Sequence, residues 1–596
     1  MKSESYRKRI ASYNKLIESL DKTINIFSYG RLVVFIVAAI SAIVLFLKRQ
    51  GSLFIFSLIA SLLVFLILVH FHSKYFNKKK EVEALRDISD INFKRIEGKY
   101  IEFKDLGEEF KEEEHPYLDD LDIFGKGSLY QFLSMAMTPK GRECLGKSLK
   151  GEGNLSKDEL LKKQKGILEL SKANMFRERL HGKARVYEER LKHYKDLIDF
   201  GNSPSEELIK GSTIVLAFIS GVTIISFILG FGLKKIPYFV PELLLILQLL
   251  ILQINKKKRQ EIFSIIGEQN KSLYAYKEII KLIERRNYKS EILKEYKEGL
   301  KSNNKSMYEG MNELYNVSES LKNRQNAVYL VLNAFLLLDY HYYIKLNNIK
   351  KEYGKNLEKA LGIIGHFEEL SCYTSLISDL QGYSMASFTE ERTLRGENIA
   401  HPLIGEKAVE NYINLNNKSA LWLITGSNMS GKSTYLRTIG INLVLAYSGA
   451  PVRSDNFICS KMNIYTCMRT GDNLEKSISS FYAEILKVKR VVEACKRGEE
   501  VFFLLDEIFK GTNSKDRHKG AEILISQLIK EKTLGLVSTH DLELSAMENI
   551  NPRIKNYNFR EYFENNEIKF DYKLRSGVSQ TQNALYLMKM AGIEIE

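Results

Sequence analysis

Four long apolar runs, arranged as two closely spaced pairs, constrain this chain of 596 residues more than any other feature of its sequence. The runs are residues 32–47, 53–69, 212–233 and 236–254. Their only charged side chain is Glu242, in the fourth run. A bilayer core about 30 Å thick takes roughly 20 helical residues, so runs of this length predict membrane spans. Because only residues 48–52 and 234–235 separate the members of each pair, we predict two transmembrane helical hairpins, at 31–72 and 211–254.

Buried core helices are the alternative interpretation, since they too can be apolar all round. A cytosolic core seldom supplies 22 consecutive uncharged residues, the length of the third run, so membrane spans are favoured. Basic residues then predict the orientation: seven lie in residues 1–31, and clusters at 74–80 and 256–259 follow the second and fourth runs. The positive-inside rule places both termini and all large soluble segments in the cytoplasm of a multi-pass protein of the cell (inner or plasma) membrane.

The net charge of the chain indicates an anionic partner but does not distinguish nucleic acid from a membrane surface. Lys plus Arg number 88 against 73 acidic residues, which gives a net charge of +15 and a pI near 9.1. This excess favours an anionic partner, either nucleic acid or an anionic membrane surface. The five cysteines are far apart and form no C-x-x-C pair, which argues against a disulfide framework and against a zinc site.

The soluble segments differ in composition and in pattern. Residues 1–30 form a basic N-terminus, and residues 73–117 form a charged connector. Residues 118–400, apart from the second hairpin, are rich in Leu, Glu, Lys and Tyr at helical spacing, which predicts an all-α core. In residues 401–596, short β-rich runs alternate with helical stretches, which predicts an α/β domain with a largely parallel sheet.

The first β-rich run of that last domain leads into a phosphate-binding motif of the form G-x-x-x-x-G-K-[ST]. The motif comprises Gly426, Ser427, Asn428, Met429, Ser430, Gly431, Lys432, Ser433 and Thr434. Backbone N–H groups of such a turn surround phosphates at the N-terminus of the following helix. We expect Lys432 to reach the β- and γ-phosphates of ATP and the Ser433 hydroxyl to bind Mg²⁺.

Two acids and a histidine follow at the ends of later strands. Val501–Leu505 is an apolar strand that leads into Asp506 and Glu507. We expect Asp506 to hold the Mg²⁺ shell and Glu507 to polarise the attacking water. His540, at the tip of the next strand, is expected to contact the γ-phosphate. The sequence therefore predicts a Mg²⁺-dependent ATPase with Lys432, Glu507 and His540 as its catalytic residues.

These motifs resemble the ATPase domain of the MutS mismatch-repair family. The segments that carry this resemblance are His401–Leu403, Thr425–Arg437 with its Asn-Met pair, Asp506–Ser514 and Ser538–His540. An earlier block, Asp120–Leu133 with Thr138–Arg142, is similar to the start of that family's helical core. The resemblance covers residues 118–596, interrupted by the second hairpin. It implies an ABC-type P-loop ATPase domain of α/β fold, preceded by a MutS-like all-α core that carries the two hairpins.

The resemblance also implies a homodimer in which each nucleotide lies between two P-loop domains. In that family a serine reaches across to the partner's γ-phosphate, and the matching segment here is Ser479-Ser480-Phe481. Ser479 is therefore the expected contact in trans, with an ordinary helix cap as the alternative. The loop Gly511–Ser514 would line the seam of the dimer. DNA is the macromolecular partner that the family implies.

The chain departs from the family pattern in ways that bear on function. Ser427 replaces a proline, and Phe509 and Lys510 replace a glycine and an arginine. Residues 1–117 leave no room for a mismatch-reading domain, and we expect no C-terminal helix-turn-helix or nuclease-like domain. We therefore expect a membrane-anchored, divergent member that engages DNA through backbone contacts without reading mismatches. The alternatives are an ATP-driven membrane machine that moves the hairpins, and a scaffold that binds ATP but scarcely hydrolyses it.

Overall fold

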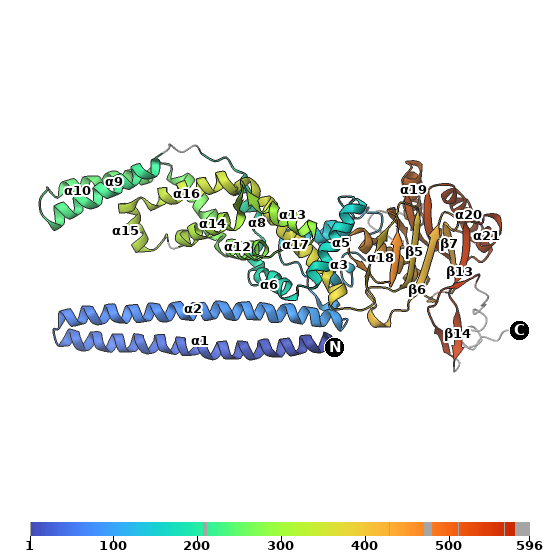
Figure 1. Ribbon diagram of the computed structural model, residues 1–596, viewed down its shortest axis with the longest axis horizontal. Helices are drawn as coiled ribbons and strands as arrows, with labels where there is room; N and C mark the ends of the chain where they lie inside the picture. Colours follow the sequence, from blue (N-terminus) through green and yellow to red (C-terminus); the bar gives the residue numbers. More distant parts are fainter. Residues whose placement is uncertain are drawn as a thin grey trace. The chain divides into compact units, whose positions relative to one another are not determined.

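The computed structural model describes residues 2–206, 211–322, 324–427, 429–469, 480–510, 512–564 and 567–578 (Figure 1). The chain divides into two compact units, each assembled from three stretches. The helical unit comprises Met1–Phe93, Met135–Cys144 and Ala173–Glu369, and the α/β unit comprises Lys94–Ser134, Leu145–Lys172 and Leu370–Glu596. The predicted order, a mostly helical region followed by a C-terminal α/β domain, is confirmed. The finer domain boundaries drawn from the sequence stay predictions.

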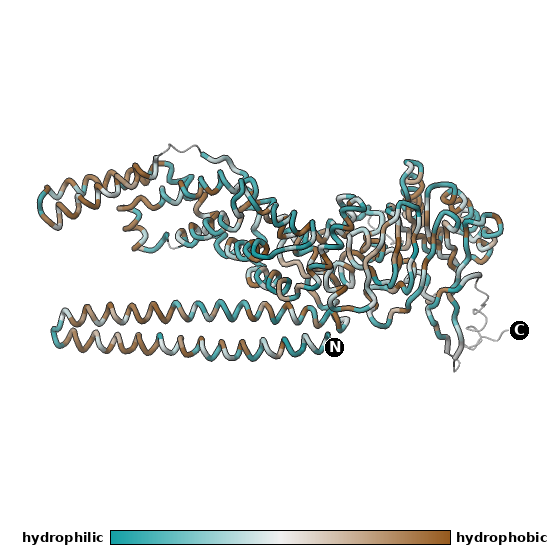
Figure 2. The backbone as a smooth tube through the Cα atoms, in the orientation of Figure 1, coloured by the Kyte–Doolittle hydropathy of each residue, from teal (hydrophilic) through white to brown (hydrophobic). Residues whose placement is uncertain are grey.

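The helical unit begins with a hairpin of two long helices, α1 (Lys2–Leu47) and α2 (Gly51–Ile96). Each helix has 46 residues and is therefore about 69 Å long at 1.5 Å per residue. Both extend well beyond the apolar halves near the turn, so the basic N-terminus and much of the predicted connector continue the same two helices (Figure 2). The charged halves pair with each other: Lys79 lies 2.6 Å from Asp21, and the ring of Phe27 stacks on that of Phe71.

Shorter helices form the rest of the helical unit. They are α6 (Asn174–Arg185), α7 (Glu188–Leu191), α8 (Tyr194–Asn202), α9 (Ser212–Phe227), α10 (Phe239–Gln253), α11 (Lys256–Glu268), α12 (Asn270–Arg285), α13 (Glu291–Gly299), α14 (Met307–Lys322), α15 (Ala327–Leu336) and α16 (Leu338–Tyr353), with a small β1–β2 hairpin (Lys301–Ser302 and Lys305–Ser306). Helix α17 (Leu357–Ser378) begins in this unit and ends in the α/β unit. Helix α12 packs against α6 and α14 and buries its apolar face, which includes Leu273, Ile280 and Ile283.

Several of these helices have the length and composition of membrane spans. Among the described residues, α1, α2 and the segment Ser212–Gly232 each qualify alone, and two bent helix pairs raise the number from three to five if each pair is one span. The first pair is α10 with α11, bent by 68°. The second is α15 with the following segment Leu338–Ser378, bent by 80°. The sequence analysis does not predict this second pair, because the apolar run in α15 is too short for a span.

The α/β unit is built on a six-stranded sheet with the strand order β10-β11-β12-β7-β13-β16. The first five strands are parallel, and β16 at the edge is antiparallel. The strands are β7 (Leu421–Thr425), β10 (Asn463–Cys467), β11 (Val501–Asp506), β12 (Thr533–Thr539), β13 (Ile554–Asn558) and β16 (Arg575–Ser576). This order places β12 between β7 and β11, so the carboxyl ends of these three central strands share one edge of the sheet.

Helices and smaller sheets surround this central sheet. The helices are α3 (Leu129–Leu133), α4 (Pro139–Leu149), α5 (Lys157–Ser171), α18 (Lys432–Tyr447), α19 (Ser480–Lys496), α20 (Ser514–Lys530) and α21 (Met547–Ile550). The four-stranded sheet β4-β9-β5-β6 contains Ser387–Phe388, Asn456–Cys459, Thr393–Ile399 and Asn411–Asn416. The two-stranded pairs are β3 (Ser384–Met385) with β8 (Pro451–Val452), and β14 (Glu561–Glu564) with β15 (Glu567–Phe570).

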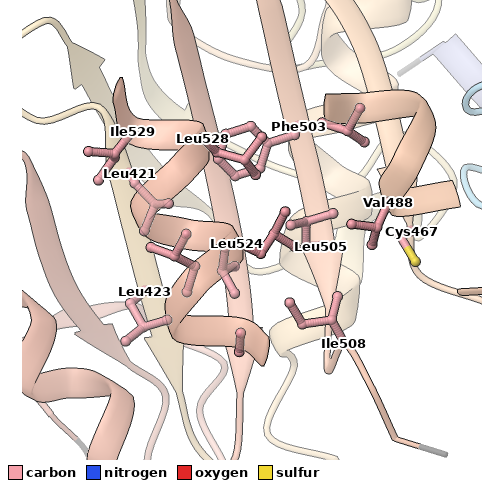
Figure 3. Packing of buried hydrophobic residues seen from close by; sticks show 14 of the residues in the cluster. Leu421, Leu423, Cys467, Val488, Phe503, Leu505, Ile508, Leu524, Leu528 and Ile529 are labelled. Carbon is pink, nitrogen blue, oxygen red and sulfur yellow. The ribbon is translucent and has the colours of Figure 1, made fainter. Parts of the chain in front are cut away.

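A hydrophobic core lies between the central sheet and helices α19 and α20 (Figure 3). Strand β11 is buried along its whole length, as expected for a parallel strand that is covered by helices on both faces. Gly535 on β12 pairs in register with Phe503 on β11, and a Cβ at Gly535 would lie 2.3 Å from the Phe503 ring. Glycine therefore lets these two strands pack around the aromatic ring, which aligns the ends of β11 and β12 at the edge that the motif residues follow.

Candidate functional site

A tight loop, Gly426–Gly431, joins strand β7 to helix α18 at the carboxyl edge of the central sheet; we call it the glycine loop. Gly426 and Gly431 have φ angles of 149° and 105°, which side chains rarely tolerate. A Cβ on Gly426 would lie 2.8 Å from the Ser430 hydroxyl and 2.9 Å from the Phe559 carbonyl oxygen. Met429 is also left-handed, with φ of 72°, and its side chain is exposed. The loop is therefore a narrow backbone cradle.

Lys432, in the first turn of α18, closes this cradle from inside. Its side chain is 4% exposed, and its Nζ donates hydrogen bonds to the carbonyl oxygens of Gly426 at 2.8 Å and Ser427 at 2.9 Å. Burial lowers the pKa of Lys432, and the Glu507 carboxylate 3.6 Å away opposes that shift. The hydroxyl of Ser430 is buried without a hydrogen-bond partner among the described residues. The loop thus holds a buried lysine bonded to its own carbonyl oxygens and, among the described residues, a buried hydroxyl without a partner.

The two predicted acids lie at the end of β11, beside the glycine loop. Asp506 is 9% exposed and its carboxylate accepts a hydrogen bond from the Ser538 hydroxyl of β12. Glu507 follows the strand, and its backbone N–H donates to the Ser538 carbonyl oxygen at 3.0 Å. Its Oε1 contacts Nε2 of His540, and its Oε2 lies 2.7 Å from Nζ of Lys510. The carboxyl ends of β11 and β12 thereby place Asp506 and Glu507 next to His540.

These contacts govern the charge state of Glu507. Burial alone would raise its pKa, but the hydrogen bonds from His540 and Lys510 outweigh burial and hold the pKa at about 2. The backbone at this point is strained, since Glu507 has φ of 49° and Phe509 has φ of 64°, both in the left-handed region. Phe509 occupies a position where the resemblance predicts glycine. Its backbone adopts the left-handed conformation that glycine favours, although it carries a bulky side chain.

Helix α19 supports that strained turn. Glu484 is 3% exposed, and its carboxylate accepts hydrogen bonds from the backbone N–H groups of Phe509 and Lys510. Burial raises the pKa of Glu484, and these N–H groups partly offset that effect. The ring of Phe481 packs against that of Phe509 at 6.2 Å between centroids. Sequence reasoning missed Glu484 as a supporting residue, because a single acid in an amphipathic helix has no motif to mark it.

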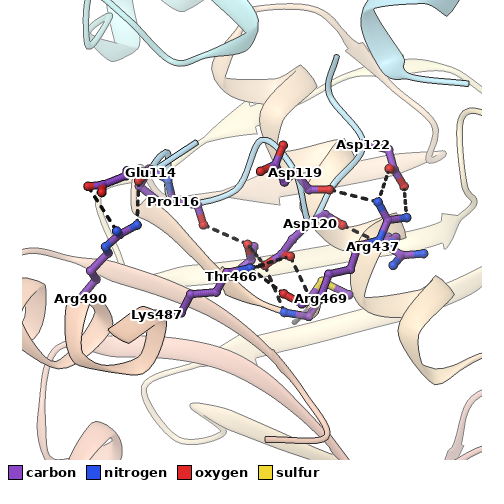
Figure 4. Close-up of polar contacts among 11 residues, drawn as sticks. Glu114, Pro116, Asp119, Asp120, Asp122, Arg437, Thr466, Arg469, Lys487 and Arg490 are labelled. Carbon is purple, nitrogen blue, oxygen red and sulfur yellow. Dashed lines mark hydrogen bonds and ion pairs between the residues drawn. The ribbon is translucent and has the colours of Figure 1, made fainter. Parts of the chain in front are cut away.

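A buried aspartate connects an early part of the chain to this region (Figure 4). Asp120 is 2% exposed, and its carboxylate accepts hydrogen bonds from four residues. Thr466 donates its hydroxyl at 2.8 Å, Met468 and Arg469 donate backbone N–H groups at 3.1 and 3.0 Å, and Lys487 donates Nζ at 3.0 Å. One side chain therefore ties the end of β10 to helix α19.

Two arginines extend this cluster. Arg469 forms a two-pronged ion pair with Asp122, at 2.6 and 2.8 Å. Arg437, on helix α18, donates from Nε to the Asp120 carbonyl oxygen at 3.1 Å. The segment around Asp120 thus bonds to the helix that begins at the glycine loop and to both α19 and the end of β10. Sequence analysis placed this segment in the helical core, whereas it packs within the α/β unit.

The structure brings together most of the predicted site residues. Lys432 and His540 each lie close to the Glu507 carboxylate, Asp506 precedes Glu507 at the end of β11, and Ser433 and Thr434 occupy the first turn of α18. Three residues lie outside the described residues: Asn428, Ser479 and Gly511. Their predicted roles stay predictions.

The arrangement fits a nucleotide with its Mg²⁺. The loop begins at Gly426, where a Cβ would clash, it carries a buried Ser430 hydroxyl without a partner among the described residues, and its lysine is held over the cradle. Asp506 supplies the hard carboxylate oxygens that Mg²⁺ prefers, and the Ser433 hydroxyl is the ligand that the motif predicts.

Comparison with known proteins gives independent information on this region. Residues 422–595 match the family model described as MutS domain V. The DNA mismatch repair protein MutS of Staphylococcus saprophyticus is 27% identical over 289 residues, which are 47% of this chain and 32% of that relative. The protein of the same name from Staphylococcus aureus strain JH9 is 27% identical over 286 residues, 46% of this chain and 32% of the relative. The match thus spans about a third of the length of these relatives.

Proposed function

Since the chain belongs to the MutS family, we propose that its α/β unit is a P-loop ATPase of the ABC type, which binds ATP with Mg²⁺ at the glycine loop and hydrolyses it. The observation that carries this proposal is the convergence of Lys432, Glu507 and His540 at one sheet edge, with Asp506 beside them. Such a group has little purpose in a structural domain, since it combines a buried lysine, two carboxyl side chains and strained backbone next to a backbone cradle.

Each residue has a distinct task in the proposed reaction. The N–H groups of the glycine loop and Lys432 would hold the phosphates, and Ser433 with Asp506 would hold Mg²⁺, which would supply positive charge next to the transferred phosphoryl group. Glu507 orients and polarises the attacking water, and His540 holds Glu507 and reaches the γ-phosphate. The hydrogen bonds from Lys432 to the two loop carbonyl oxygens must break before its ammonium group can bind a phosphate. Phosphate binding therefore replaces contacts within the loop.

We place this activity in a homodimer. Ser479 is then the contact to the partner's γ-phosphate, and the loop Gly511–Ser514 lines the seam. The similarity to MutS proteins supports this proposal. Helix α19, which begins directly after Ser479, supports it too, because Glu484 and the contact between Lys487 and Asp120 hold that helix in place.

We also propose that the protein is anchored in the cell membrane by its hairpins, with both termini and the ATPase domain in the cytoplasm. The apolar side chains near the turn of α1 and α2 are exposed, for example Phe46 at 73% and Phe56 at 71%. The polar contact in this stretch points inward instead, between the hydroxyls of Ser41 and Ser57, which lie 2.9 Å apart. Apolar surface outside and small polar groups between helices are typical of helices in lipid.

DNA is the first candidate for a macromolecular partner. The printed name of the relatives, DNA mismatch repair protein, and the net charge of +15 both favour it. We propose contacts to the sugar-phosphate backbone, which depend strongly on salt. Retention of duplex DNA by the detergent-solubilised protein at low salt, with loss at high salt, supports this partner; no retention at low salt rejects it.

A membrane machine without nucleic acid is the second candidate. It is favoured by the position of the second hairpin, which is inserted between α8 and α11 of the helical unit and not attached at a terminus. Motions of that unit would reach the hairpin directly. ATP turnover that responds to lipid composition and ignores DNA would favour this candidate.

The ATPase proposal is tested by separating binding from turnover. Glu507→Gln should bind Mg²⁺–ATP with nearly the wild-type affinity and lose most turnover, because binding uses the loop and the metal ligands. Lys432→Ala should weaken binding about 10- to 100-fold, since a hydrogen bond to a charged group contributes about 1.5–3 kcal/mol. Glu522→Gln, an exposed change on α20 paired only with a nearby lysine in the described contacts, is the matched control and should alter neither quantity. Wild-type turnover in Glu507→Gln would reject the assignment.

A further inference from the structure

Helix α15 has its apolar and polar sides reversed relative to a helix on the surface of a water-soluble protein. The side that faces the rest of the helical unit carries Tyr329 and Asn333, each 8% exposed. The side that faces away carries Val328 at 64%, Leu330 at 58% and Val331 at 59% exposure. Water would favour the opposite arrangement, since burying a valine or leucine side chain contributes about 1.5–3 kcal/mol. The medium beside this face is therefore apolar.

The second hairpin, α9 with α10, lies directly beside α15 and shares the reversal. Its buried side chains include Thr223, Ser226 and Gln248, whereas Phe218 at 70% and Leu250 at 61% are among its exposed ones. Thus the apolar surface of α15 continues an apolar surface on both helices of the hairpin.

Specific contacts fix α15 to this hairpin. The ring of Phe335 meets that of Phe227 at 5.0 Å between centroids, edge to face. With the Gln248 amide oriented so that its nitrogen faces the carbonyl oxygens of Ala334 and Phe335, the nitrogen donates to both, and the amide oxygen accepts from the Thr223 hydroxyl at 2.9 Å. These polar groups are satisfied between helices, as lipid requires, because the hydrocarbon offers no hydrogen bonds.

Buried charged groups and an aromatic ring connect the segments on either side of α15 to the rest of the helical unit. Arg324 donates to both carboxylate oxygens of Asp339, at 3.1 and 2.6 Å. The Arg259 guanidinium lies over the Tyr340 ring at 4.1 Å, and the Tyr340 hydroxyl donates to the carbonyl oxygen of Ile251 at 2.9 Å. Arg259 is 1% and Asp339 3% exposed, so these charges are paired within the protein and do not lie on the exposed apolar face of α15.

The length of α15 decides how it can meet a membrane. Its 10 residues span about 15 Å, half of a bilayer core, and the chain then bends by 80° at Leu337, which has φ of 50°. Such a helix is too short to cross a bilayer, but it is long enough to lie within the outer part of one leaflet.

We propose that α15 is a third membrane-embedded element, which lies in the cytoplasmic leaflet against the second hairpin with Val328, Leu330 and Val331 among lipid acyl chains. This proposal rests on the proposed insertion of that hairpin and extends it, because it brings the helical unit itself into the bilayer. Lipid is the occupant, since α15 packs against both helices of the hairpin and its exposed apolar side chains adjoin theirs.

Spin-label accessibility in the full-length protein tests this placement. The background variant is Cys144→Ala, because the other four cysteines are buried. Val331→Cys, with Leu330→Cys as a second variant on the same face, carries the nitroxide. Leu247→Cys on the hairpin is the lipid reference, and Lys345→Cys on α16 is the water reference. The protein is reconstituted in vesicles of phosphatidylcholine and phosphatidylglycerol, and collisions with oxygen and with a water-soluble nickel chelate are compared.

We expect the labels at 331 and 330 to meet oxygen readily and the nickel chelate poorly, as the label at 247 does, and opposite to the label at 345. If 247 is in lipid but 331 and 330 meet the nickel chelate, the placement of α15 is wrong while the membrane anchor stands. If 247 also meets the chelate, the anchor itself is wrong. Labels at 331 and 330 that meet neither reagent show a protein partner on this face, such as a second copy, and overturn the proposal.

Discussion

At the scale of single residues, Glu507 concentrates the chemistry of the site. One of its oxygens contacts His540 and the other lies 2.7 Å from Nζ of Lys510, so its orientation is fixed before any water arrives. The neighbouring Phe509 keeps a left-handed backbone that glycine adopts more easily, and Glu484 holds that backbone in place. The contacts that stabilise this strained turn therefore come from residues outside the motif itself.

The depressed pKa of Glu507 predicts a specific dependence of stability on pH. Its pKa falls from 4.5 to about 2 on folding, although burial opposes the change. A carboxylate with a lowered pKa stabilises the fold fully above its unfolded pKa, and this stabilisation is lost as the pH falls through the folded value. The thermal unfolding midpoint of the wild type should therefore exceed that of Glu507→Gln by a constant amount above pH 4.5, and the gap should narrow towards pH 2. A gap that stays constant down to pH 2 would show that the ionised form is not stabilised by folding.

At the scale of secondary-structure elements, the Asp120 carboxylate joins β10 to α19. Asp120→Asn keeps the shape but removes the charge that faces Lys487 and turns one acceptor into a donor opposite backbone N–H groups. We expect a loss of about 1–3 kcal/mol in the free energy of unfolding of the α/β unit, the range for buried groups left unsatisfied. Thermal or denaturant unfolding followed by a probe in that unit measures this loss.

The neighbouring residue provides the matched control. Asp119 is exposed, and in the described contacts it offers its backbone carbonyl oxygen to Arg469 and no carboxylate oxygen. Asp119→Asn should therefore change stability by less than about 0.5 kcal/mol. Equal effects of the two substitutions would contradict the role of Asp120 as a buried junction.

The local elements of the α/β domain could be predicted because short motifs determine them. Lys432, Asp506 and His540 each follow or end a strand whose apolar run is visible in the sequence, and parallel strands bring their carboxyl ends to one edge. The long-range partners could not be predicted. In the sequence, Asp120 is one acid in a polar segment. Only the folded structure shows that its carboxylate accepts hydrogen bonds from residues more than 340 positions away in the chain.

The exposed apolar side of helix α15 could not be predicted from the sequence, for a different physical reason. Hydropathy identifies spans by length, and its apolar run is too short to qualify. The informative property is which of its sides is buried, and this depends on the helices that pack against it. For the same reason, the sequence predicted the apolar halves of α1 and α2 but not that their charged halves continue as a paired helical stalk, fixed by contacts such as that between Lys79 and Asp21.

At the scale of the whole molecule, the proposed dimer makes each active site depend on two chains. Ser479→Ala removes the proposed contact in trans, and Lys432→Ala removes nucleotide binding in cis. Each variant alone should lack ATP turnover, whereas mixed subunits should regain part of it, because some heterodimers contain one intact site. The ATPase rate of the mixture is the measurement. No recovery on mixing, together with wild-type turnover that is independent of protein concentration, would contradict a composite site.

The central claim is that a MutS-type ATPase is mounted on membrane-embedded helices with its nucleotide site in the cytoplasm. The most direct test compares ATP hydrolysis by sealed membrane vesicles of both orientations, from cells that produce equal amounts of the wild type or of Glu507→Gln. The difference between the two proteins should appear in alkali-washed inverted vesicles and be absent from right-side-out vesicles until detergent opens them. A Glu507-dependent activity in the soluble fraction, or equal hydrolysis by both proteins in every preparation, would contradict the account.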